Sequence, residues 1–334
     1  MGKVTFNGSY QYIISVDNLL LAWQEFLRGK RDRRDVQEFE RDLMANILAL
    51  HRDLTSKTYR HSQYHAFNIS DPKPRSIHKA SVRDRLLHHA LYRVLYLFFD
   101  KTFIADSYSC QLDKGTHRAM NRFRAFARKA SRHHTRTVWV LKCDIKKFFA
   151  SIDQNILIEI IKSYLPDRDI QWLISQIVSS FHSTKKYRGL PLGNLTSQLL
   201  VNVYMNAFDQ FIKHSLKAKY YIRYADDFVM LSHDKERLRN QLPRISEFLE
   251  NKLKLSLHPE KVFIKTLSSG VDFLGWTHFP NHRVLRTAAK RRMFKNLTLK
   301  HGNDGTVQSY FGLLQHGNAM GLVRQVRAVR RRIK

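Results

Sequence analysis

The sequence predicts an α+β protein in which helices cover an antiparallel sheet. Two apolar segments with strand-like composition, 138–144 and 219–232, carry this prediction, together with helical spacing of the apolar residues around them. The order of strand, helices, hairpin and helix is typical of helices packed on one face of an antiparallel sheet. With 334 residues, the chain is long enough for two domains and a sizeable buried core.

Each element follows from a local pattern. Asp17 can cap a helix whose apolar residues recur at helical spacing, and the first hundred residues are mostly predicted as helix. Between about 58 and 80 the pattern becomes extended around the stiff, proline-containing segment Asp71–Arg75. The other helices are expected at 81–102, 116–132, 153–164, 168–181, 196–216, 234–251 and in the basic last fifty residues, with a Gly/Pro-rich turn at 189–193 and short strands around 253–279.

Charge and cysteine content exclude several classes of protein. The chain has 58 Lys and Arg against 28 Asp and Glu, a formal net charge of +30, which indicates a polyanionic partner. Nucleic acid is the first candidate and an anionic membrane surface the second. Two cysteines cannot form a disulfide framework, no apolar run approaches the ~20 residues of a membrane span, and the N-terminus lacks a signal-peptide pattern. We therefore expect a protein of a reducing, cytoplasmic compartment that is neither secreted nor embedded in a membrane.

A basic segment at 116–132 is a candidate for contact with nucleic acid. It carries six arginines and lysines, with Phe123 and Phe126 interleaved among them. Because the whole chain is strongly basic, Arg118 and Arg122 are expected to contact a nucleic-acid backbone. The alternative is an ordinary solvated basic face.

Two adjacent carboxylates, Asp226 and Asp227, interrupt an otherwise apolar hairpin. Aspartate is depleted in strands, so the pair is predicted to form a tight turn, with an ordinary exposed turn as the alternative. Like charges near a core repel unless a cation lies between them. A second apolar strand, about eighty residues earlier, ends at Asp144. If the three carboxylates meet, they supply the oxygen ligands for two Mg²⁺ ions, and Mn²⁺ can substitute.

These residues resemble the motifs of reverse transcriptases. Tyr224–Asp227, which reads Tyr-Ala-Asp-Asp, resembles their YxDD motif, and Asp144 with Phe148-Phe149 resembles their other palm motif. Lys73-Pro74-Arg75 resembles the fingers of retron and group II intron enzymes, and 271–275 resembles the primer-grip hairpin. The resemblance implies an RNA-directed DNA polymerase with a right-hand fold of fingers, palm and thumb.

The resemblance covers roughly residues 70–280 and implies an order of domains. It would place an N-terminal helical extension at 1–60 and fingers at 61–135. The palm would follow at 136–280, including a fingers/palm insertion at 165–195 and the primer-grip hairpin. A basic helical thumb would end the chain at 281–334.

The block Gly189–Gln198 indicates a subfamily. Leu192 stands where most reverse transcriptases have Gln, and Ser197-Gln198 follows, a combination that resembles the enzymes of diversity-generating retroelements. That resemblance implies error-prone copying of a template-repeat RNA into cDNA for mutagenic retrohoming. The alternatives are the reverse transcriptase of a retron, a group II intron or a phage-defence system. A non-catalytic RNA-binding scaffold is an alternative of a different class.

The resemblance also assigns roles at the metal and the leaving group. Asp144 and Asp226 would bind both ions, Asp227 would complete the ligand set, and the carbonyl of Ile145 would be a further ligand. Lys261 would protonate the departing pyrophosphate, although generic phosphate attraction or surface charge explains a lysine equally well.

Further residues would bind the incoming dNTP and the nucleic acid. Phe149 matches the steric gate against a 2′-hydroxyl, with a core Phe as the alternative, and Lys73 and Arg75 would bind the triphosphate, with surface charge as the alternative. Gly193 would let the backbone approach the nascent base pair. Leu192 cannot hydrogen-bond the nucleotide or template as Gln could, which would relax checking of the base pair, and simple packing is the alternative. Gly275 would contact the primer strand.

The expected partners follow from the same resemblance. They are a template RNA, a primer strand of RNA or DNA, dNTPs and a small basic accessory protein, with no membrane among them. Two basic proteins repel, so the accessory protein would bind through limited patches or through shared RNA.

Overall fold

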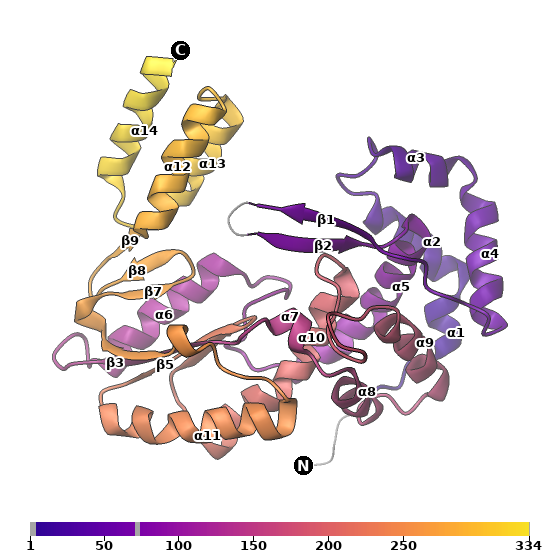
Figure 1. Cartoon of the computed structure of the whole chain (residues 1–334), viewed down its shortest axis with the longest axis horizontal. Coiled ribbons are helices and arrows are strands. Elements are labelled where there is room, and N and C mark those ends of the chain that lie inside the picture. The colour runs from indigo at the N-terminus through magenta and orange to yellow at the C-terminus, as the bar shows by residue number, and fades with distance from the viewer. Residues whose placement is uncertain (1–4, 71–73, 334) are drawn as a thin grey trace. The chain divides into compact units, whose positions relative to one another are not determined.

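The computed structural model describes residues 5–70 and 74–333, which fold as two compact units (Figure 1). The first unit consists of Met1–Ala105, Ile145–Ser215 and Ile245–Leu257, and the second of Asp106–Asp144, Leu216–Arg244 and His258–Lys334. Each unit is therefore built from segments that are distant in the sequence.

Helices dominate the first unit. Ser15 and Ser81 cap α2 and α5 because their hydroxyl oxygens accept backbone N–H groups of the first turn. α10 packs against α5 and has mostly buried side chains. The helices of this unit are α1 (Tyr10–Ile14), α2 (Val16–Phe26), α3 (Arg34–Arg41), α4 (Leu43–Thr55), α5 (Val82–Phe99), η1 (Asp100–Thr102), α7 (Phe148–Ser151), α8 (Gln154–Lys162), α9 (Arg168–Ser179), α10 (Leu195–Gln210) and η2 (Phe211–Ser215).

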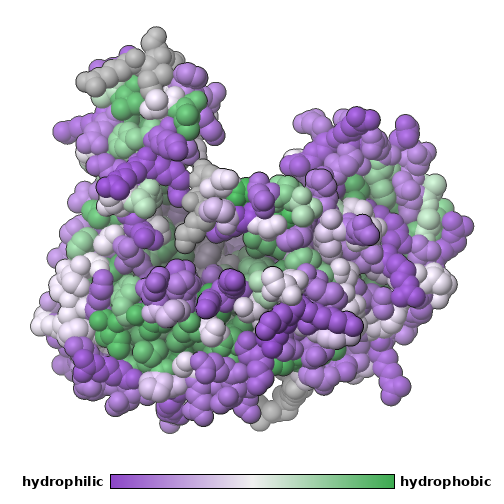
Figure 2. All heavy atoms as spheres, in the orientation of Figure 1, coloured by the Kyte–Doolittle hydropathy of each residue, from purple (hydrophilic) through white to green (hydrophobic). Residues whose placement is uncertain are grey.

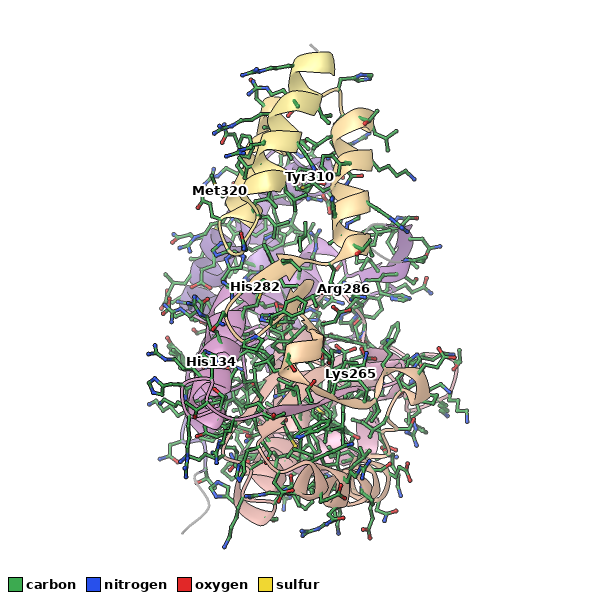
Figure 3. All side chains as sticks on the ribbon, turned by 90° about the vertical axis from the view of Figure 1, so that its left-hand side faces the viewer. His134, Lys265, His282, Arg286, Tyr310 and Met320 are labelled. Carbon is green, nitrogen blue, oxygen red and sulfur yellow. The ribbon has the colours of Figure 1, made fainter. Side chains whose placement is uncertain are left out.

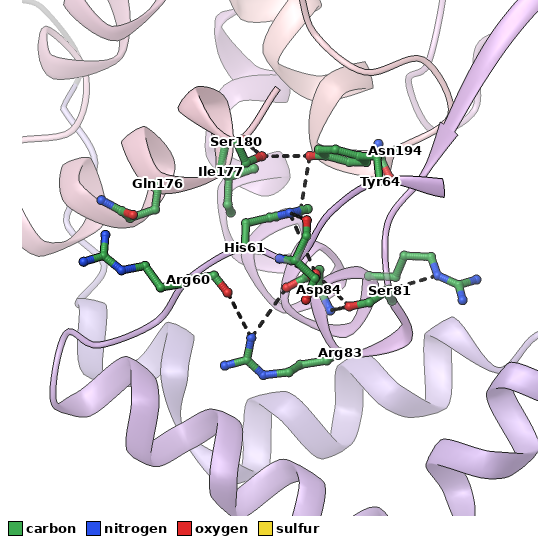
Figure 4. A network of polar contacts seen from close by, with 12 residues as sticks. Arg60, His61, Tyr64, Ser81, Arg83, Asp84, Gln176, Ile177, Ser180 and Asn194 are labelled. Atoms are coloured by element: carbon green, nitrogen blue, oxygen red, sulfur yellow. Dashed lines mark hydrogen bonds and ion pairs between the residues drawn. The ribbon is translucent and has the colours of Figure 1, made fainter. Parts of the chain in front are cut away.

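A buried carboxylate ties the start of α5 to the preceding segment. Asp84 is fully buried and accepts hydrogen bonds from Tyr59 Oη at 2.8 Å, Ser81 Oγ at 2.7 Å and the Ser62 amide at 3.0 Å. Figure 4 shows Asp84 beside Ser81 and His61. Burial alone would raise the pKa of Asp84, but His61 and these hydrogen bonds hold it below its usual value. Asp84 is thus an anchor of the fold in this unit.

An exposed hairpin of the first unit occupies the segment predicted as extended. It consists of β1 (His65–Ile69) and β2 (Arg75–Lys79), which pair antiparallel with His65 opposite Lys79. The amide of His78 donates to the carbonyl of Leu192 at 3.0 Å, and Asn194 Nδ2 donates to the carbonyl of His78 at 3.0 Å. The hairpin is therefore fixed to the turn that precedes α10.

The second unit contains a four-stranded antiparallel sheet in the order β4-β5-β3-β6. Its strands are β3 (Trp139–Asp144), β4 (Tyr221–Tyr224), β5 (Asp227–Ser232) and β6 (Phe263–Thr266). Successive side chains of a strand point to opposite faces, so Val140 and Val229 lie on one face. There they form a core cluster with Phe123 and Phe126 of α6 (Thr116–Ala130). α11 (Lys235–Leu253) begins in this unit and ends in the first.

A small sheet and three helices complete the second unit. The sheet has the order β7-β8-β9, from β7 (Val271–Phe273), β8 (Trp276–His278) and β9 (Arg283–Leu285). Trp276 of this sheet is buried in a core cluster with Met293, Leu297 and Val326 of the last three helices. The remaining elements are η3 (Pro259–Lys261), η4 (Leu267–Ser269), α12 (Thr287–Leu299), α13 (Asp304–Leu314) and α14 (Met320–Ile333).

The α+β prediction, with an antiparallel sheet and covering helices, is confirmed. The last short strand, β9, extends beyond the strand region expected around 253–279. Phe123 and Phe126, which are interleaved with basic residues in the sequence, are buried. Their burial follows from helical periodicity, which turns them toward the sheet and leaves the basic residues outside.

The surface is largely hydrophilic. Figure 2 shows hydrophilic residues over most of the face that it presents, as expected for a chain of net charge +30. Across residues 5–70 and 74–333, no helix combines the length and the apolar character that crossing a membrane requires.

Candidate active site

The two acidic segments meet at one end of the sheet in the second unit. In the register of β3 with β5, Asp144 lies directly opposite Asp227. Both side chains project from the same face, because residues opposite each other in an antiparallel pair share a face. We call this the carboxylate face, and its members on the two strands are Val140, Lys142, Asp144, Asp227, Val229 and Leu231.

The turn beside these carboxylates consists of Ala225 and Asp226, because Tyr224 pairs with Asp227. The prediction that Asp226 and Asp227 together form the turn was wrong by one residue, and Asp227 is the first residue of β5. Ala225 adopts a φ of 55°, a left-handed conformation that is unfavourable for a residue with a Cβ. Arg223 supports it, since Nη1 donates to the Ala225 carbonyl at 3.2 Å.

Arg223 is fully buried on the sheet face opposite Asp227. Its Nη2 donates to Ser107 Oγ at 3.1 Å, and its backbone amide donates to the carbonyl of Asp106 at 3.0 Å. The Tyr108 amide in turn donates to the Arg223 carbonyl at 3.0 Å. Arg223 therefore links the Asp106–Tyr108 segment to the acidic turn.

A buried lysine faces the carboxylates. Lys142 is 8% exposed, and its Nζ lies 2.9 Å from Asp227 Oδ1. The two atoms are within ion-pair distance but lack the angles of a hydrogen bond, so this oxygen has no hydrogen-bond donor within the described residues. The pKa of Asp227 is raised to about 6: burial is the main cause, Lys142 opposes the rise, and the charges of Asp144 and Asp226 add to it.

A second lysine pairs with the other strand's carboxylate. Lys261 Nζ donates to Asp144 Oδ1 at 2.9 Å, and the amide of His258 donates to the Asp144 carbonyl at 2.8 Å. The 3₁₀ turn η3, capped by His258, places this lysine. The structure thus places Lys261 beside Asp144, while its role as a proton donor to pyrophosphate stays a prediction.

The chemistry of the site fits a hard cation. Its donors are carboxylate oxygens, which suit Mg²⁺ or Mn²⁺, and a bound cation would relieve the repulsion from Asp144 and Asp226 that adds to burial in raising the pKa of Asp227. In the described part of the chain, however, no group of three or more His, Cys, Asp or Glu side chains is already arranged to hold a metal. Two of the three carboxylates are instead paired with lysines, whose ammonium groups supply the positive charge.

The residues predicted to bind the dNTP lie in the first unit. Phe149 of α7 is half-buried, and its ring meets the buried Phe148 edge-on, as expected if Phe148 is the core residue. Arg75 is exposed at the start of β2. Lys73 lies outside the described residues. Ile145 is buried in this unit, and its carbonyl as a metal ligand stays a prediction.

Gly193 and Leu192 lie beside the β1–β2 hairpin. Gly193 has a φ of 111°, and a Cβ there would come within 2.9 Å of Ile77 Cγ2. This position therefore needs glycine to accommodate the hairpin, a reason that the sequence did not reveal. Leu192 is half-buried and accepts a hydrogen bond from the His78 amide through its carbonyl.

The residues predicted to contact nucleic acid lie in the second unit. Arg118 is exposed on α6, whereas Arg122 Nε donates to Asp106 Oδ1 at 2.7 Å and its guanidinium lies over the Phe126 ring. Gly275 has a φ of 85° and forms, with Leu274, the two-residue turn between β7 and β8. Their contacts with nucleic acid stay predictions.

Sequence reasoning missed Lys142 and Arg223. Both are charged residues inside otherwise apolar strands, where a charge is depleted unless it has a partner. That signal was present at Lys142, two residues before Asp144, and at Arg223, three residues before Asp226.

Comparisons with known proteins indicate the family of the chain. A family model described as reverse transcriptase (RNA-dependent DNA polymerase) matches residues 69–278. Protein YkfC of Escherichia coli is 24% identical over 66% of this chain and 66% of its own length. The group II intron-encoded protein LtrA of Lactococcus lactis is 22% identical over 87% of this chain and 59% of its own length. The chain thus spans just under two thirds, or less, of the length of these curated relatives.

Two solved structures are similar in fold. The apo telomerase of Candida tropicalis aligns with a TM-score of 0.52 and 13% identity, over 73% of this chain and 60% of its own. The telomerase of Candida albicans, in complex with a fragment of telomeric RNA, aligns with a TM-score of 0.51 and 10% identity, over 76% and 54%. The fold is that of a right-hand polymerase, while the predicted boundaries of fingers, palm and thumb stay predictions.

Proposed function

Because this chain belongs to the reverse transcriptase (RNA-dependent DNA polymerase) family, we propose that it synthesises DNA on an RNA template. The observation that carries the proposal is the position of Asp144 opposite Asp227, with Asp226 adjacent, at the end of a buried sheet. The reaction is attack of a primer 3′-hydroxyl on the α-phosphate of a dNTP. A P–O bond forms to the primer, the bond to the β-phosphate breaks, and pyrophosphate leaves.

Reverse transcriptases use divalent metal ions, and we propose two Mg²⁺ ions here, with Mn²⁺ as a substitute. Asp144, Asp226 and Asp227 would hold them, with the Ile145 carbonyl as a further ligand. When bound, the ions would stabilise the charge that develops on the attacking and leaving oxygens.

The chain's own side chains would then divide the remaining tasks. Lys142 stays beside Asp227 and limits the negative charge of the site. Lys261, released from Asp144, would give a proton to the pyrophosphate, and Arg75 and Lys73 would bind the triphosphate. Phe149 would exclude ribonucleotides.

We further propose error-prone copying of a template-repeat RNA in a diversity-generating retroelement, with a small basic accessory protein as partner. Leu192 and Ser197-Gln198 support this subtype. A group II intron enzyme is the second candidate, because the group II intron-encoded relative aligns along most of the chain. A template repeat and a variable repeat in the DNA that flanks the gene would favour the first candidate, and intron boundaries would favour the second.

Primer extension on RNA and DNA templates with Mg²⁺ tests the polymerase. The wild type should extend a primer on RNA, and the double change Asp226→Ala plus Asp227→Ala should abolish extension, since electrostatic stabilisation of the reacting phosphate is lost. Glu236→Gln, which alters an exposed ion pair with Arg239, is the matched control and should extend normally. Extension that survives the double change refutes the site. RNA binding without extension by the wild type would indicate the non-catalytic scaffold.

A further inference from the structure

A pocket of about 390 Å³ lies in the second unit, and none of the three carboxylates of the candidate active site lines it. Three segments enclose it: α6, the loop between β8 and β9, and the connection between α13 and α14. In Figure 3, His282 marks the β8–β9 loop, below the three C-terminal helices. The residues that matter for its chemistry are Arg124, Phe279, His282, Arg283 and Asn318.

The pocket carries positive charge that the described residues do not neutralise. Nη1 of Arg283 is buried and has no hydrogen-bond partner in residues 5–70 and 74–333. Burial, and then the nearby charge of Arg124, lower the pKa of Arg283, so the two guanidinium groups repel each other. None of the thirteen described residues that line the pocket is Asp or Glu. The buried, unpartnered Nη1 of Arg283 and the exposed guanidinium of Arg124 therefore offer hydrogen-bond donors and positive charge to an anion.

The walls of the pocket are fixed before any ligand arrives. Arg283 Nε donates to the carbonyl of His316, and Nη2 donates to Asn121 Oδ1 of α6 at 3.0 Å. The Asn318 amide donates to the Arg283 carbonyl at 2.8 Å. These bonds join all three enclosing segments. Such preorganisation lowers the cost of binding.

The β8–β9 loop also presents a stacking surface. The rings of Phe279 and His282 lie 4.8 Å apart with an interplanar angle of 13°, and the Phe279 amide donates to the His282 carbonyl at 2.9 Å. His282 is exposed and Phe279 half-buried, so the outer ring is open to a planar ligand. Every nucleobase has a face that stacks on such rings.

We propose that this pocket binds a nucleoside phosphate, with the phosphate at Arg124 and Arg283 and the base against His282. Its volume suits one nucleotide unit. The nucleotide can belong to a single-stranded RNA or be free, and the net charge of +30 favours the strand. The site is separate from the carboxylates and would anchor RNA without taking part in the reaction.

Fluorescence anisotropy with a short fluorescein-labelled single-stranded RNA, without dNTPs or primer, measures this binding. The double change Arg124→Gln plus His282→Ala should raise the Kd about tenfold, because it removes one phosphate contact and one stacking ring. The slope of log Kd against log salt should become shallower by about 0.7 for the lost phosphate contact. The control is Arg244→Gln plus His233→Ala, which changes exposed residues outside the pocket and outside the basic segment 116–132, and should leave Kd and slope near wild type.

Further experiments locate the bound nucleotide and identify its source. RNA that carries 4-thiouridine should crosslink to the peptide that contains His282. Competition by AMP at low concentration would identify a free nucleotide as the ligand, and competition by RNA alone would identify the strand. Arg124→Lys should retain the salt slope, since the charge remains. Equal affinities and slopes for the pocket variant and its control, or a crosslink elsewhere, would overturn the proposal.

This outcome is independent of the proposed polymerase. The variant Asp226→Ala plus Asp227→Ala should lose primer extension and keep its affinity for RNA. The pocket variant, in contrast, should lose affinity for RNA. The two proposals can therefore fail separately.

Discussion

Lys142 and Asp227 form an ion pair on the carboxylate face, with Nζ 2.9 Å from Oδ1, in which the lysine is buried and the aspartate half-buried. A buried lysine usually destabilises a protein unless its charge is matched. Here the ammonium group of Lys142 neutralises the charge of one carboxylate, that of Asp227, and supplies positive charge where the proposed metal ions would bind. The pair explains how three carboxylates can share one end of a sheet before any cation is bound.

Lys142→Met should make folding dependent on divalent cations. Loss of the ammonium leaves Asp227 without its counter-charge, which should cost about 3 kcal/mol in EDTA. Mg²⁺ should then raise the melting temperature of the variant more than that of the wild type. Differential scanning calorimetry with EDTA and with Mg²⁺ measures both effects.

Lys265→Met is the control for Lys142→Met. Lys265 lies opposite Val140 on the same sheet but is exposed. Its removal should change stability by less than about 1 kcal/mol, with no added response to Mg²⁺. An identical response of both variants would show that Lys142 has no special relation to the cation.

The raised pKa of Asp227, about 6, predicts a pH dependence of stability in EDTA. The folded state holds this proton more tightly than the unfolded chain does. The resulting stability is complete below the usual carboxyl pKa and is lost as pH rises through about 6. Urea unfolding of the wild type and of Asp227→Asn across this range isolates the contribution. If the wild type became more stable relative to Asp227→Asn as pH rises in this range, the raised pKa of Asp227 would be contradicted.

Arg223→Lys should lower kcat for dNTP incorporation about tenfold with little change in KM. The lysine keeps the charge but cannot hold both the Ala225 carbonyl and Ser107 Oγ as the planar guanidinium does, so the turn that carries Asp226 loses its support. Steady-state kinetics measures the separate effects on kcat and KM, and circular dichroism checks the fold. Arg237→Lys on exposed α11 is the control. A rise in KM alone would show that Arg223 does not position the turn.

Leu192→Gln should reduce misincorporation opposite template adenine roughly fivefold, the effect of one regained hydrogen bond. Sequencing of the cDNA products measures the error rate. Leu192→Met keeps the apolar character and should keep the wild-type errors. If Gln and Met give the same error rate, the side chain at this position only packs.

The sequence predicted the two acidic segments and the sheet because apolar strands that end in carboxylates are rare. It could not predict the register that places Asp144 opposite Asp227, because that pairing depends on contacts about eighty residues apart. It also misplaced the turn, since an alanine with positive φ was not expected where Gly or Asn is favoured. The support from Arg223 is tertiary and leaves no periodic signal.

The need for glycine at 193 was equally hidden. The motif suggested a close approach to a base pair, whereas the structure shows the side chain of Ile77 beside this position. A glycine in a sequence indicates that something comes near, but only coordinates identify the neighbour.

The alternation along β3 and β5 has a consequence for how this protein can vary. Val140 and Val229 are embedded in the core on the same face that ends in Asp144 and Asp227. Insertion or deletion of one residue within β3 would turn Asp144 to the other face of the sheet, and the same change within β5 would turn Asp227. Engineered variants should therefore substitute side chains in β3 and β5 without changing the length of these strands. Insertions and deletions belong in surface loops, where an added residue does not move Asp144 or Asp227.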